Sequence, residues 1–136
     1  MKKLNLVIVY SPDEERVLMC RRAREPYRGK LNFVGGKAEP GEEDLAAAYR
    51  ELREETGISA DQIRLVHVMN FQYFLSGVEL QVFAGRLSGE VSLREEVNAL
   101  LWVARSEDFC DTDRFAGECN IEHMLQQVEL YRDRIF

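Results

Sequence analysis

The stretch that decides the fold runs from Gly35 to Ile58 and reads GGKAEPGEEDLAAAYRELREETGI. Pro40 and Gly41 form a turn signal before a helical pattern, and Gly57 stands just past its end. This is the asymmetry of breaker residues expected around a helix. The first turn of the predicted helix is acidic, which complements the positive end of the helix dipole. Its residues are Glu42, Glu43 and Asp44.

The predicted helix has an apolar face and an acidic face. Residues at three- and four-residue steps form the stripe that we expect to be buried. The acidic face carries Glu51, Glu54 and Glu55, because residues three and four apart are neighbours on a helix. Ala47, one turn before Glu51, leaves space above this face for a ligand. The apolar stripe consists of Leu45, Ala48, Tyr49 and Leu52.

The three carboxylates have two explanations. Like charges at this spacing repel each other, and Mg²⁺ or Mn²⁺ relieves the repulsion because hard cations prefer oxygen ligands. Arg50 adjoins the cluster and can fix the orientation of a carboxylate by pairing with it. The alternative is a solvated acidic surface, which many helices carry. The carboxylates alone leave both explanations open.

The spacing of residues around the helix separates these explanations. Gly36 is followed after five residues by Glu42, and after seven more by RELREETGI, from Arg50 to Ile58. In this order and spacing the stretch resembles the Nudix box, the signature of the Nudix (MutT-like) hydrolases, at every defined position. The match covers about a sixth of the 136 residues.

The resemblance implies both a fold and a reaction. The fold is α/β, a Nudix-type α/β/α sandwich with a mixed sheet between helices, and we expect one domain over residues 1–136. The reaction is hydrolysis of a nucleoside diphosphate linked to a further group, with Mg²⁺ or Mn²⁺ as the cofactor. The metal ligands implied are Glu51, Glu54, Glu55 and the carbonyl of Gly35.

The resemblance leaves the general base open. In the family it is either a glutamate of the box or a glutamate from a later loop. The candidates here are Glu51 and then Glu96, with Glu95 as the second choice in that loop. Arg50 would orient Glu51, and Glu54 completes the catalytic set. Glu42 has an electrostatic or structural role near the site.

Substrate contacts are expected just before the box. In MutT-like members an arginine of a matching Arg-Arg-Ala stretch contacts the substrate, which implies this role for Arg22. Arginine matches phosphate geometry, and the basic loop leads directly into the box. Asn32 can hydrogen-bond a nucleobase edge, although a strand-edge role is an alternative. The double glycine lets the backbone approach a ligand closely. The expected substrate-binding set is Arg22, Asn32, Gly36 and Lys37.

A small-molecule nucleotide is the expected partner. The leading choice is a nucleoside triphosphate, with an oxidised purine triphosphate included, cleaved to a monophosphate and pyrophosphate. Dinucleoside polyphosphates, ADP-ribose and nucleotide sugars remain alternatives, because pocket residues set specificity. Relatives often have Trp and Pro where this chain has Leu31 and Val34, and these positions shape the entrance to the site. A nucleotide-sensing module that does not cleave is an alternative of another class, but such modules commonly lose box carboxylates.

Composition excludes some partners. The net charge of −6 argues against nucleic acid polymers and anionic membranes, and no apolar run is long enough to span a bilayer. Three scattered cysteines predict free thiols in a reducing cytosol, and hence a cytoplasmic protein. His67 and His123 are too far apart in sequence for a metal cluster. A homodimer is compatible with the family, in which dimers are frequent.

The rest of the chain predicts strands and one terminal helix. Asn120 is a plausible N-cap for that helix, with its apolar face at helical spacing. Among the aromatic residues of the long hairpin, we expect sheet core more than base stacking for Phe71, Tyr73 and Phe74. The expected strands are 4–10, 16–21, 31–34, 63–75, 78–87 and 99–103. The expected apolar face of the helix is Ile121, Met124, Leu125, Val128 and either Leu130 or Tyr131.

Overall fold

The computed structural model describes all 136 residues, which form a mixed sheet between helices. Strands pair in the order β3-β2-β1-β5-β4, and β6 pairs with β2. The β1–β5 pair is parallel over nine residue pairs, whereas the other pairs are antiparallel. The strands are β1 (Lys2–Tyr10), β2 (Arg16–Arg21), β3 (Leu31–Asn32), β4 (Val66–Tyr73), β5 (Val78–Arg86) and β6 (Ala99–Ala104).

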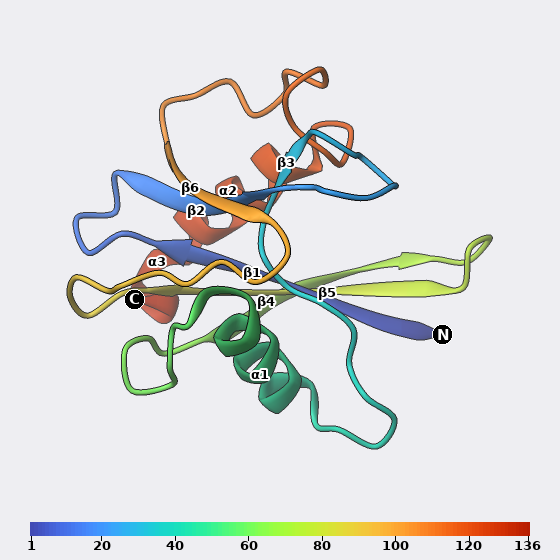
Figure 1. The fold of residues 1–136 in the computed structure, drawn as a ribbon, viewed down its shortest axis with the longest axis horizontal. Coiled ribbons are helices and arrows are strands. Elements are labelled where there is room, and N and C mark those ends of the chain that lie inside the picture. The colour runs from blue at the N-terminus through green and yellow to red at the C-terminus, as the bar shows by residue number, and fades with distance from the viewer.

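Helices cover both faces of the sheet. Figure 1 shows α1 (Asp44–Thr56) on one side, with α2 (Asn120–Leu130) and the short α3 (Arg132–Ile135) on the other. Alternate residues of β1 serve the two cores, because successive side chains of a strand point to opposite faces. Val7 and Val9 pack in the core beneath α1, and Ile8 and Tyr10 pack in the core beneath α2. The predicted α/β/α sandwich with a mixed sheet is confirmed.

The start of α1 differs from the prediction. Only Asp44 lies in the first turn, because Glu43 is the N-cap and its carboxylate accepts hydrogen bonds from Leu45 N and Ala46 N at 3.2 and 3.1 Å. Glu42 precedes the helix. The helix ends as expected at Gly57, which adopts a left-handed φ of 81° and donates its N–H to Arg53 O. The helix therefore ends at Thr56, one residue after Glu55 of the acidic face.

The buried face of α1 is also shifted. Ala48 and Leu52 are fully buried as predicted, whereas Leu45 and Tyr49 are only partly buried. Ala47 was expected to leave space for a ligand, but this prediction is wrong, because Ala47 is fully buried.

The chain after β6 corrects three predictions. Asn120 is not the N-cap, since Cys119 holds that position with a φ of 75° and no side-chain cap, and Asn120 begins α2. Leu130 and Tyr131 are 70% and 50% exposed, so neither belongs to the buried face of the helix. Ile135 of α3 is buried in the core beneath α2. The remaining apolar residues of α2 are buried as predicted.

The third correction concerns the cysteines. Cys110 and Cys119 form a disulfide that closes the loop before α2, and only Cys20 is a free thiol. Burial raises the pKa of the Cys20 thiol to about 11. A nine-residue separation in sequence gave no sign of this pairing.

None of the helices has the length and apolar character needed to cross a bilayer.

Candidate active site

The double glycine lies against the acidic face of α1. The segment from Val34 to Ala38 runs antiparallel to β1, with bridges between Val7 and Val34 and between Leu4 and Lys37. A Cβ built on Gly36 would lie 2.3 Å from the carboxyl carbon of Glu51. A Cβ on Gly35, whose φ is 150°, would lie 2.0 Å from the backbone oxygen of Asn5. Only glycine at both positions lets the turn approach the carboxylates and the sheet so closely.

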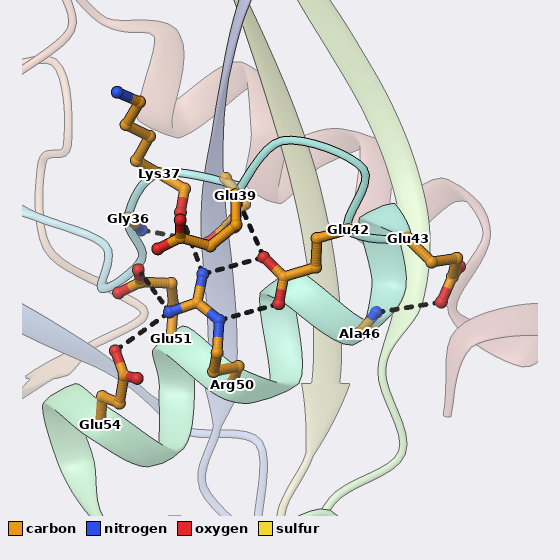
Figure 2. A network of polar contacts seen from close by, with 10 residues as sticks. Gly36, Lys37, Glu39, Glu42, Glu43, Ala46, Arg50, Glu51 and Glu54 are labelled. Atoms are coloured by element: carbon orange, nitrogen blue, oxygen red, sulfur yellow. Dashed lines mark hydrogen bonds and ion pairs between the residues drawn. The ribbon is translucent and has the colours of Figure 1, made fainter.

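Arg50 lies at the centre of the carboxylates (Figure 2). Its Nε and Nη2 donate to the two oxygens of Glu42 at 2.8 and 3.0 Å, which is a bidentate pair. Its Nη1 donates to Glu51 and Glu54, each at 3.1 Å, and Nη2 also donates to the Lys37 carbonyl. The Arg50 hydrogen bonds lower the pKa of Glu42 to about 2. The guanidinium thus joins the box helix to the segment before it.

Glu55 has the most strongly raised pKa among the carboxyl groups of the site. Burial raises its pKa to about 7, and the charges of Glu51 and Glu96 add to the shift. The Gly35 N–H donates to its Oε2 at 3.2 Å and opposes the shift. Burial also raises the pKa of Glu51, and the Arg50 hydrogen bond opposes that rise. The site therefore holds more negative charge than its own cations neutralise.

The later loop brings one of its two glutamates to the site. Glu96 and Glu55 line the same small cavity, together with Asn98 and Leu100. Glu95 instead accepts the Leu100 N–H at 2.8 Å, which uses its carboxylate to hold the start of β6. The geometry favours Glu96 over Glu95, in the order that the sequence predicted.

The donors at this site fit a divalent cation. As the side chains lie here, no three acidic, histidine or cysteine residues converge on one point, and the Arg50 guanidinium lies among the box glutamates. The available donors are nevertheless all oxygens, which suit Mg²⁺ and Mn²⁺. The raised pKa values of Glu51 and Glu55 mark charge that an added cation would stabilise. Glu51, Glu54, Glu55 and the Gly35 carbonyl are the groups that would hold it.

A cavity of about 560 Å³ extends from this cluster between the sheet and α2. One end is lined by Glu55 and the double glycine. Its apolar walls include Leu6 and Leu80 from the strands and Met124 from α2. The four residues predicted to bind substrate, Arg22, Asn32, Gly36 and Lys37, all line this cavity. Glu55 of the cluster and the four substrate-binding candidates therefore line one cavity.

Two pairs of cavity residues were not found from the sequence. The Tyr27 hydroxyl donates to the Glu118 carboxylate at 2.8 and 2.9 Å, across 91 residues of sequence. Asn120 Nδ2 donates to the Tyr73 hydroxyl at 3.2 Å. All four residues line the cavity. Neither pair forms a motif, since each joins segments that only the folded chain brings together.

The prediction of sheet core for the hairpin aromatics is correct for one residue and wrong for two. Phe71 is partly buried against the core beneath α2, as predicted. Tyr73 is 42% exposed and lines the cavity, and Phe74 is 77% exposed, so neither is part of the sheet core. His67 and His123 belong to no group of metal-binding side chains. His67 stacks on Phe83, and His123 meets Phe71 edge to face.

Comparison with known proteins supports one family. A family model described as NUDIX domain matches residues 2–115. An oxidized purine nucleoside triphosphate hydrolase from Danio rerio is 30% identical over 94% of this chain and 96% of its own length. A CTP pyrophosphohydrolase from Escherichia coli (strain K12) is 32% identical over 79% of this chain and 80% of its own. The structure of an Ap4A hydrolase from C. elegans, 15% identical, superposes with a TM-score of 0.77 over 97% of this chain and 99% of that one.

Proposed function

This chain belongs to the Nudix family and is a hydrolase acting on pyrophosphate bonds, and we propose that its substrate is a nucleoside triphosphate. An oxidised purine triphosphate is our first choice, with a nucleoside monophosphate and pyrophosphate as the products. The observation that carries this proposal is that Glu55 and the double glycine line the same cavity as the apolar residues. A volume of about 560 Å³ suits one base and its sugar, with the phosphates directed toward Glu55.

The polar groups of the cavity favour a purine with several N–H donors. The Glu118 carboxylate can accept two hydrogen bonds, and Asn32 offers both an acceptor and donors. Oxidation of a purine at C8 converts a ring acceptor into an N–H donor, which a carboxylate binds better than an unmodified ring nitrogen. The relative from Danio rerio, named for oxidised purine nucleoside triphosphates, is consistent with this choice.

The box residues divide the chemical work. A divalent cation, when bound, supplies charge neutralisation on the phosphates and lowers the pKa of water. Glu51, Glu54, Glu55 and the Gly35 carbonyl would hold it, and the Arg50 guanidinium keeps Glu51 and Glu54 in place. Glu51, whose pKa is raised by burial, is the first candidate for the general base, and Glu96, which lines a small cavity with Glu55, is the second. Which of these two acts is tested by the pH profile of each glutamine variant.

Positioning of the phosphates completes the mechanism. Arg22 lines the cavity near Glu55, and its charge lowers the pKa of that carboxyl group. The guanidinium can therefore bind a phosphate oxygen next to the carboxylates. Lys37, which directly follows the double glycine, also lines the cavity and supplies a second cation. These contacts hold the scissile bond in line for attack, which provides much of the rate gain in phosphoryl transfer.

Hydrolysis of a nucleotide panel tests this proposal. The panel contains ordinary and 8-oxo purine triphosphates, CTP, a dinucleoside polyphosphate, ADP-ribose and a nucleotide sugar. We expect the highest kcat/KM for an oxidised purine triphosphate, with pyrophosphate released. The variant Glu118→Leu should reduce the preference for the oxidised purine over the ordinary one, while Glu107→Leu, an exposed change outside the cavity, should not. A higher kcat/KM for any substrate outside the triphosphates contradicts the choice of substrate.

A further inference from the structure

Asn5 is a buried amide on the face of the sheet that α1 covers. It is 2% exposed and alternates along β1 with Val7 and Val9 of that core. Its register partner on β5, Gln81, is also 2% exposed. Gln81 Nε2 donates to Asp44 on α1 at 2.9 Å, which explains one of the two buried amides. The other amide lies against the double glycine.

The Asn5 side chain replaces one backbone hydrogen bond. The bridges between β1 and the segment after β3 place Asn5 opposite Gly36. In a regular antiparallel pair of this kind, two residues exchange both of their backbone N–H···O bonds. Here the Asn5 N–H donates to the Gly36 carbonyl at 2.8 Å, but the Gly36 N–H donates to the Asn5 side-chain Oδ1 at 3.1 Å. The turn is therefore held by the side chain at this point.

This exchange fixes the direction of one carbonyl. A peptide bond is planar and trans, so the Gly36 N–H and the Gly35 carbonyl point in opposite directions. Because the Gly36 N–H points toward the Asn5 amide in the core, the Gly35 carbonyl points away from that amide. The Gly35 N–H is fixed in turn by Glu55. Two side chains thus define the orientation of the turn.

We propose that Asn5 is a positioning residue, whose Oδ1 holds the Gly35–Gly36 peptide so that the Gly35 carbonyl faces the cation bound by the α1 glutamates. The proposal rests on the metal-dependent function proposed above. Asn5 Nδ2 has no hydrogen-bond partner in the protein, although it is buried. An unpaired buried N–H lowers stability, so the stability of the fold does not account for an amide here. The acceptor oxygen accounts for it.

Titration of Mn²⁺ into the protein without substrate tests the proposal. Asn5→Leu has a similar shape but no acceptor, and we expect its Mn²⁺ affinity to fall about 10- to 100-fold, as for partners that orient metal ligands. Asn5→Asp keeps the Oδ1 acceptor and replaces the unpaired Nδ2 by a second carboxyl oxygen, which adds an ionisable group at this buried position, and its affinity should stay well above that of Asn5→Leu. If Asn5→Leu does not fold, Asn5→Val replaces it, because valine is smaller and favours strands.

Gln81→Leu is the matched control. It removes the neighbouring buried amide on the same face, which contacts Asp44 rather than the turn. Thermal unfolding of each variant shows how much stability is lost, and Gln81→Leu should lose stability without losing Mn²⁺ affinity. Wild-type affinity in Asn5→Leu, equal losses in Gln81→Leu and Asn5→Leu, or no rescue by Asn5→Asp would overturn the proposal. Absence of nucleotide hydrolysis by the wild type would instead contradict the proposed function and leave the binding comparison intact.

Discussion

Replacing Glu55 by glutamine should make the metal-free protein more stable at pH 8. The folded-state pKa of Glu55 is about 7, against an ordinary value of 4.5, because the side chain is buried beside Glu51 and Glu96. When the pKa of a carboxyl group is higher in the folded state than in the unfolded state, its contribution to stability is complete at pH values below the unfolded-state pKa. That contribution is lost as the pH rises through the folded-state pKa. For Glu55, this loss of stability therefore occurs between about pH 4.5 and about pH 7.

The magnitude follows from the size of this shift. A difference of about 2.5 pKa units corresponds to about 3.4 kcal/mol above pH 7, at 1.36 kcal/mol per unit. Glu55 retains some solvent contact, which screens its interactions, so we expect about 1–3 kcal/mol. Glutamine removes the charge and keeps an oxygen that can accept the Gly35 N–H. The same change should weaken Mn²⁺ binding, since it removes a ligand.

Urea unfolding in EDTA at pH 5.5 and pH 8 measures the effect. The free energy of unfolding of Glu55→Gln minus that of wild type should be about 1–2 kcal/mol larger at pH 8 than at pH 5.5, because about 1.5 of the 2.5 pKa units lie above pH 5.5. Comparison of the two proteins at each pH cancels the groups that they share. Glu54→Gln is the control, because Glu54 is 51% exposed and should show little change between the two pH values. Equal stability of Glu55→Gln and wild type at pH 8 would contradict the raised pKa of Glu55 on which this prediction rests.

Three further predictions concern the same cluster. Arg50→Lys keeps the charge but cannot hold Glu42, Glu51 and Glu54 together, so kcat should fall at least about 10-fold while circular dichroism shows an intact fold. Gly36→Ala should displace the Glu51 carboxylate and lower the Mn²⁺ affinity, measured by calorimetric titration, about 10- to 100-fold. Gly89→Ala is the control and should leave the Mn²⁺ affinity unchanged, because Gly89 has open space for a Cβ. Mn²⁺ affinity should rise with pH and level off above about pH 7, where Glu55 is ionised, and a flat profile between pH 5.5 and 8 would contradict this assignment.

The sequence predicted the parts of the site that depend on local spacing. Residues three and four apart share a helix face, so the position of Glu51, Glu54 and Glu55 followed from the helical pattern alone. The Arg50 contact with Glu51 followed for the same reason. The start of α1 could not be predicted from this spacing. Glu43 is the N-cap, and Glu42 lies outside the helix, where it pairs with the Arg50 guanidinium.

Contacts across long stretches of chain could not be predicted in this way. The Tyr27–Glu118 hydrogen bond depends on two loops that meet only at the mouth of the folded cavity. The contribution of Asn5 depends on a register between β1 and the turn, in which a side chain replaces a backbone acceptor. The Cys110–Cys119 disulfide depends on the path of the loop that connects β6 to α2. No periodicity marks any of these residues.

The measurement that tests the central claim most directly is pyrophosphate release from nucleoside triphosphates by wild type and Glu54→Gln, with Mg²⁺ and with EDTA. Glu54 contacts only Arg50 among the charged groups and is half exposed, so the variant should fold normally. We predict hydrolysis by wild type that requires Mg²⁺, and a kcat at least about 100-fold lower in Glu54→Gln, equivalent to about 2.7 kcal/mol of barrier. Equal turnover by both proteins, or turnover by wild type in EDTA, would contradict the claim that the box glutamates hold a catalytic cation.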